Sequence, residues 1–249
     1  MIQLLISPAL ALVLSMPLTT PPDTIAPGAH ALDRAVMVES VATLDNFGIR
    51  DSVQVKGGTM TTTTRPVPGV WDQWAIVSRW TSATGAPTSL DSIIVATHPL
   101  RAVRHRVQSA ADSAEIVYVG DHVSGWVEPG HGKPRKTIDA TLAHGAFPDG
   151  LREQVIAWLP LHNGFAGELR AFDAWSGSAG AERLIGVHVT GADTLAAQGE
   201  KVLCWKVTVD RRDPSGIVHT LWIAKNNRRL LRSESRNATG KLLWFDVAR

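Results

Sequence analysis

The sequence predicts a mainly β (α+β) fold, in which a large antiparallel sheet carries one or two helices on one face. Three observations support this prediction. Apolar and polar residues alternate along many short runs, turn-forming residues separate these runs at roughly 8–12-residue spacing, and one segment has a clear helical period. Because successive side chains of a strand point to opposite faces, each alternating run can bury one face and leave the other in water.

The first 31 residues resemble a secretory signal peptide followed by a linker. Residues 2–18 are almost entirely apolar, and Ala29-His30-Ala31 fits the small-residue cleavage pattern of such peptides. Two features depart from that pattern, because no Lys or Arg precedes the apolar run and the gap before the cleavage pattern is long. The run is also short for a membrane span and contains Pro8 and Pro17. We therefore expect export to the periplasm or cell envelope, and a single domain over residues 32–249.

Runs typical of strands precede the helical segment. Residues 60–65 are rich in threonine, and alternation in residues 71–81 places Trp74 and Trp80 on one face of a strand. Glycine and proline separate the runs, as in residues 129–132. The predicted strands of this half are Met60–Arg65, Trp71–Thr81, Ser89–His98, Val103–Gln108, Ala114–Val119, His122–Glu128 and Arg135–Ala143.

One helix is predicted over Leu151–Leu159. Its apolar residues recur at helical spacing, so they share one face of the helix, and Pro160 ends it. A second candidate helix, Ala31–Leu44, is only loosely periodic. Because an amphipathic helix among antiparallel strands must bury its apolar face, we expect it to cover one face of the sheet.

Strands resume after this helix and end in a meander. Predicted strands at Gly167–Ala174, Ala181–Gly191 and Gly199–Asp210 lead into Val202–Val247, where alternating runs are joined by turn-forming residues. Asn226-Asn227 suits a hairpin turn, because Asn tolerates positive φ better than most residues. These runs predict an up-and-down antiparallel meander.

Composition excludes several classes of protein. The formal charge is +2, from 25 basic and 23 acidic residues, which gives no electrostatic reason to expect a nucleic-acid partner. Cys204 is the only cysteine, so an intrachain disulfide and a multi-cysteine metal site are both impossible. We expect Cys204 to be a buried, small apolar residue.

The histidines raise the alternative of an enzyme. The chain contains nine, but it has no HExxH helix, no His-x-His pair and no GxSxG nucleophile motif. We therefore predict a non-enzymatic protein with no catalytic residue, no metal and no cofactor. A metal-dependent or other hydrolytic enzyme is the alternative, and it requires convergence of at least three among His98, His105, His122, His131 and His144.

Several segments resemble a family of uncharacterised exported bacterial domains allied to the outer-membrane lipoprotein carriers. The resemblance spans Ser89–Val247, and the segments that carry it are Thr97–His105, Leu159-Pro160-Leu161 with Gly164-Phe165, Trp205–Val207, Thr220–Lys225 and Arg228–Arg232. It implies a strongly curved antiparallel sheet, a half-barrel, whose concave side is filled by helices. The terminal meander would then be the closing edge of the half-barrel. The carriers hold acyl chains on the concave side, but no residue role transfers from them.

A binding function is the prediction that follows from this resemblance. The ligand would be a lipid or another apolar small molecule, with a partner protein as the alternative. The candidate ligand-binding residues are Trp74, Trp80, Trp205, Trp222 and Trp244, which either line a pocket or pack as core. A basic stripe at Arg228, Arg229, Arg232 and Arg236, joined by Lys225 and Lys241, offers peripheral contact with a membrane or a partner. Nothing in the sequence indicates the oligomeric state.

Overall fold

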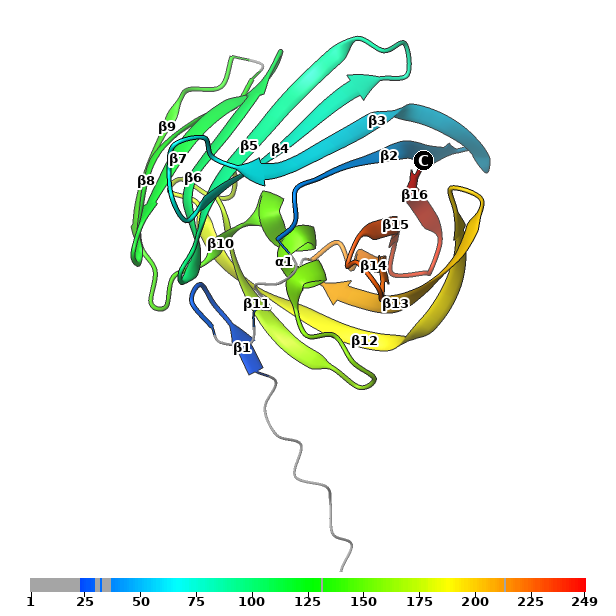
Figure 1. Ribbon diagram of the computed structural model, residues 1–249. Coiled ribbons are helices and arrows are strands. Elements are labelled where there is room, and N and C mark those ends of the chain that lie inside the picture. Colours follow the sequence, from blue (N-terminus) through cyan, green and yellow to red (C-terminus); the bar gives the residue numbers. More distant parts are fainter. Residues whose placement is uncertain (1–22, 30–31, 33–36, 131, 213) are drawn as a thin grey trace, which may run out of the picture.

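The computed structural model describes residues 23–29, 32, 37–130, 132–212 and 214–249. These residues form one curved sheet that does not close, with one short α-helix inside its curve (Figure 1). This arrangement confirms the predicted fold class and the predicted half-barrel. Most of the predicted signal peptide lies outside the described residues, so its prediction stays open. No helix in the described part of the chain is both long and apolar enough to cross a membrane.

In the described part of the chain, the sheet has 16 strands. Before the helix these are β1 (Asp23–Ile25), β2 (Ser40–Arg50), β3 (Val53–Pro66), β4 (Gln73–Ser82), β5 (Pro87–Thr97), β6 (Leu100–Ser109), β7 (Ser113–Val119), β8 (His122–Glu128), β9 (Lys136–Thr141) and β10 (Phe147–Pro148). A 3₁₀ turn, Asp149–Leu151, leads into α1 (Arg152–Trp158). The remaining strands are β11 (Ala166–Asp173), β12 (Ala181–Ala197), β13 (Glu200–Asp210), β14 (Val218–Ala224), β15 (Leu230–Arg236) and β16 (Leu242–Ala248).

The strand order is β1-β11-β12-β13-β14-β15-β16-β2-β3-β4-β5-β6-β7-β8-β9, with β10 also pairing β11. Neighbours are antiparallel except for the parallel pairs that β1 and β10 form with β11. The predicted meander is confirmed as β13 to β16. Its predicted position at the closing edge is wrong, because β16 pairs with β2 and lies within the sheet, with Ala248 opposite Leu44.

The second predicted helix, Ala31–Leu44, is also wrong where the structure describes it. Residues 37–39 have no regular structure, and Ser40–Leu44 belong to β2. Alternation explains the outcome, because Leu44 is 4% exposed whereas Val41 is 64% exposed, as expected for residues on opposite faces of a strand. The rest of this prediction falls largely on residues outside the described part.

Helix α1 lies inside the curve of the sheet (Figure 1), as the amphipathic pattern of Leu151–Leu159 predicts. The side chains of Leu151, Val155, Ile156 and Leu159 have no exposed surface. They belong to one apolar cluster with inner-face residues of distant strands, namely Ile76, Ile93, Val95, Leu169, Ile185, Val187, Val207, Leu221 and Ile223. The helix is therefore the centre of the core that joins the two halves of the sheet.

Substitution of a helix residue should test this assignment. We expect Ile156→Ala to lower the free energy of unfolding by about 2–5 kcal/mol, because it removes buried methylene groups and leaves a cavity. Leu203→Ala is the matched control, since Leu203 is 51% exposed and surface changes usually stay within about 0.5 kcal/mol. Urea unfolding followed by circular dichroism measures both values. Equal losses in the two variants would contradict the central role of α1.

Candidate functional site

A cavity of about 280 Å³ lies between α1 and the strands β2 and β3. We call it the helix–sheet cavity. Its lining comes from four parts of the chain, and most of its surface is apolar. The lining residues are Val38, Ser40, Ala42, Leu44, Met60, Thr62, Thr64, Glu153, Gln154, Ala157, Trp158, Asn227, Arg228, Arg229 and Leu230.

The register of β2 and β3 explains the sheet side of this cavity. Leu44 lies opposite Met60, and Ala42 lies opposite Thr62. Residues that face each other in an antiparallel pair share a face, and so do residues two apart on one strand. Alternate residues of both strands therefore point to α1, and several are small enough to leave space beside it.

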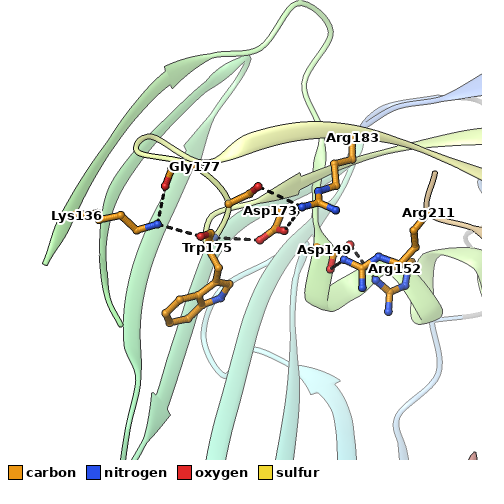
Figure 2. A network of polar contacts seen from close by, with 9 residues as sticks. Lys136, Asp149, Arg152, Asp173, Trp175, Gly177, Arg183 and Arg211 are labelled. Carbon is orange, nitrogen blue, oxygen red and sulfur yellow. Dashed lines mark hydrogen bonds and ion pairs between the residues drawn. The ribbon is translucent and has the colours of Figure 1, made fainter. Parts of the chain in front are cut away.

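Polar contacts fix α1 at both ends. At its start, Asp149 accepts hydrogen bonds from Arg152 at 2.9 Å and from Arg211 at 3.1 Å (Figure 2). At its end, Arg228 Nη1 donates to the backbone carbonyl of Leu159 at 3.0 Å. The helix therefore cannot move into the helix–sheet cavity without breaking one of these contacts.

Two polar side chains of α1, Glu153 and Gln154, line the cavity, and protein contacts offset only part of the cost of burying them. Burial raises the pKa of the Glu153 carboxyl, and the nearby carboxylates Asp246 and Asp149 raise it further, whereas Arg152 opposes the shift. Gln154 Oε1 is buried and has no hydrogen-bond partner in the described structure. A hydroxyl or amide donor of a bound molecule could satisfy such an acceptor.

The five predicted tryptophans do not form one site. Trp74 and Trp205 are half-buried against the central core cluster. Trp222 lies on the opposite face from Trp205, because Trp205 pairs with Ile223. None of the five lines the helix–sheet cavity, and the tryptophan that does so is Trp158 of α1.

The other predicted tryptophans, Trp222, Trp244 and Trp80, each lie beside neighbouring side chains of the sheet and not in a shared pocket. Trp222 donates through Nε1 to Asp193 at 3.2 Å, and the cations of Lys206 and Arg232 lie over its ring. Trp244 packs edge-on against His219, and Trp80 lies opposite Met60 in register.

The histidines of the described residues do not converge. His98 bonds Asp72, His105 bonds Asp91 at 3.0 Å and His122 lies 3.4 Å from Asp139. Among the described residues, which do not include His131, no group of three or more His, Cys, Asp or Glu side chains could hold a metal.

A second cavity, of about 490 Å³, is lined by acidic residues that include Asp91, Asp112, Asp149 and Asp173. Each of these carboxylates already has a protein partner. Asp91 bonds His105, Asp112 accepts from the Gly130 backbone, Asp149 holds its arginine pair, and Asp173 lies 3.0 Å from Arg183 (Figure 2). This cavity is larger, but its carboxylates are already paired with groups of the protein itself. We therefore favour the helix–sheet cavity as the candidate site.

The predicted basic stripe divides into two groups. Arg232 and Arg236 both pair with Glu234, whose side chain is only 7% exposed. Arg228 and Arg229 instead line the helix–sheet cavity. Alternation along the strand correctly places Arg232 and Arg236 with Glu234, but it does not indicate the cavity, because the cavity depends on the distant helix.

Comparison with known proteins gives a family match and distant structural similarity. A family described as "Protein of unknown function (DUF3108)" matches residues 45–242, which confirms the prediction of an uncharacterised family. A Brucella abortus protein, described as beta-barrel-like and of the DUF1849 domain, is 11% identical with a TM-score of 0.46 and covers 88% of this chain and 98% of its own. A Bacteroides fragilis protein, called exported and with a YmcC-like fold, is 13% identical with a TM-score of 0.38, covering 84% and 92%. No curated protein matches.

Glu153 provides a pH-dependent test of the site. Its raised folded-state pKa means that the folded protein retains a proton which the unfolded chain loses above a pKa of about 4.3. The ionised group therefore lowers stability as pH rises through this window. We expect Glu153→Gln to increase the free energy of unfolding at neutral pH and to have little effect below the unfolded-state pKa.

Glu128→Gln is the matched control, because Glu128 is exposed and does not line the cavity. Urea unfolding of both variants and the wild type at acidic and neutral pH gives the comparison. A Glu153→Gln variant that is less stable than the wild type at neutral pH would show that the ionised carboxylate is stabilised, against this assignment.

Proposed function

The chain belongs to DUF3108, a family of proteins of unknown function, and we propose that it binds a lipophilic ligand in the helix–sheet cavity as a non-enzymatic protein of the cell envelope. The single observation that carries the proposal is an apolar cavity between the helix and the concave face of the sheet. The apolar, signal-like residues 2–18 support export.

The lining supports an acyl chain as the ligand. Ala42, Leu44 and Met60 on the sheet side face Ala157 and Trp158 of α1 across the cavity. Removal of hydrocarbon from water contributes about 0.8 kcal/mol per CH₂ group. The binding free energy of an acyl chain therefore grows with each CH₂ group that enters the cavity. The cavity, at about 280 Å³, lies just below the usual range of about 300–1,000 Å³ for small-molecule sites, and this size suits one chain better than several. The resemblance to lipoprotein carriers supports the same class of ligand.

A second function, peripheral contact with a membrane surface, is favoured by one exposed ring. Trp71, between β3 and β4, is 86% exposed, and its neighbour Val70 is 44% exposed. The ring stacks on His98 at 5.8 Å, and Asp72 accepts a hydrogen bond from the His98 backbone at 3.0 Å. Trp is favoured at membrane interfaces, because its ring is apolar and its N–H is polar. We propose that the exposed Trp71 ring, which His98 holds in place by stacking, contacts lipid.

Filling the cavity should abolish binding of an apolar probe. We expect Ala42→Phe to weaken binding of the neutral fluorescent probe N-phenyl-1-naphthylamine at least about tenfold, or about 1.4 kcal/mol, because the new ring occupies the lined space. Val41→Phe is the matched control, since Val41 is the adjacent residue on the other face and is 64% exposed. Fluorescence titration measures both affinities. Absence of probe binding to the wild type, or equal binding by both variants, would refute the proposal.

Vesicle co-sedimentation should test the membrane contact. We expect Trp71→Ala to reduce the fraction of protein that sediments with phosphatidylethanolamine–phosphatidylglycerol vesicles several-fold, because the main exposed apolar ring is lost. Leu203→Ala, which also removes an exposed apolar side chain, should leave the fraction unchanged. Equal sedimentation of the wild type and the Trp71→Ala variant would exclude this role for Trp71.

A further inference from the structure

Two arginines lie at one end of the helix–sheet cavity. Arg228 and Arg229 belong to the turn between β14 and β15, and both line the cavity. The turn is held by its own hydrogen bonds, because the Arg228 backbone N–H donates to Ala224 at 3.0 Å and the Arg229 backbone N–H donates to Asn227 Oδ1 at 3.1 Å. The contact of Arg228 with the Leu159 carbonyl places this turn at the end of α1.

Neither guanidinium has a carboxylate partner among the described residues. The hydrogen bond from the Arg228 side chain goes to a neutral carbonyl. Most other arginines near the core do have acidic partners, as in the pairs Arg170–Glu182 and Arg183–Asp173. A half-buried cation beside an apolar cavity loses solvation, and an anion that enters the cavity would restore the lost interaction.

The acidic side chain of the cavity, Glu153, forms no ion pair with either arginine among the described residues, and its own ion-pair partner is Arg152 at 3.9 Å. Glu153 lies near the start of α1, whereas Arg228 contacts the carbonyl of Leu159 just beyond its end. At a rise of 1.5 Å per residue, these positions are about 9 Å apart along the helix axis. The charged groups that act on Glu153 are Arg152, Asp246 and Asp149, and neither Arg228 nor Arg229 is among them.

The cavity is therefore cationic at one end and mainly apolar along its length. Leu230 lies beside the arginines, and Ala157 and Trp158 continue the lining along α1. A planar guanidinium can form two parallel hydrogen bonds with a carboxylate, which makes arginine well suited to this head group. The volume of the cavity, just below the usual range for ligand sites, suits one hydrocarbon chain.

We infer that the helix–sheet cavity binds a single-chain amphiphile with a carboxylate head, the class of a long-chain fatty acid, and that Arg228 and Arg229 hold the carboxylate. The inference rests on the proposed function, since it names the ligand of the same cavity. The hydrocarbon chain lies between α1 and the strands β2 and β3.

Displacement of the neutral probe by matched competitors tests the head group. We expect dodecanoate to displace N-phenyl-1-naphthylamine from the wild type at a concentration at least about tenfold lower than dodecanol. Arg229→Gln should reduce this preference to about threefold or less, because it weakens the binding of dodecanoate more than that of dodecanol. Arg229 is chosen because Arg228 also contacts α1, so its loss could disturb the fold.

Arg50→Gln is the matched control, because Arg50 is exposed and does not line the cavity, and it should retain the full preference. If the probe and dodecanol bind but dodecanoate binds no better, the inference fails while the proposed function stands. If the wild type binds no probe, the proposed function fails and the inference fails with it. Tighter binding of dodecyl phosphate than of dodecanoate, lost in Arg229→Gln, would replace the carboxylate with a phosphate and overturn the inference.

Discussion

The fold depends on burial of one short helix inside a curved sheet. Helix α1 has only 7 residues, and isolated helices shorter than about 12–15 residues are marginal in water. It is therefore stable only because Val155 and Ile156 are fully buried in the core, while Asp149 and Arg228 hold its ends. The sheet depends equally on the helix, since its concave face would otherwise leave apolar side chains in water.

The same constraint explains why a cavity exists beside α1. A helix of this length spans about 10 Å, whereas the 14 residues of β3 extend for roughly 45 Å. The helix can therefore cover only part of the inner face. Thr62 and Thr64 lie where β3 passes beside it, and the small Ala42 lies on the neighbouring strand. Long strands, small side chains and a short, fixed helix together leave the space unfilled.

The sequence alone predicts what depends on local pattern and misses what depends on distant pairing. The meander Val202–Val247 and the helix are correct, because alternation and helical period are local. The position of β16 beside β2 is not local, since Phe245 pairs with Phe47 from the other end of the chain. Alternation also shows which residues of one strand share a face, but not which face is concave. The sequence therefore groups Trp205 with Trp222, whereas the strand register places them on opposite faces of the sheet.

The location of a candidate anion site depends on the pairing of charges and not on their number. In sequence, the arginines from Arg228 to Arg236 form one basic stripe. In the folded chain, the single carboxylate of Glu234 lies between Arg232 and Arg236 and offsets part of their positive charge within the protein. The turn residues Arg228 and Arg229 have no such partner among the described residues, and they line the space that α1 leaves open. We therefore expect an incoming anion to gain more at the turn than on the strand, although the strand carries the same number of these arginines.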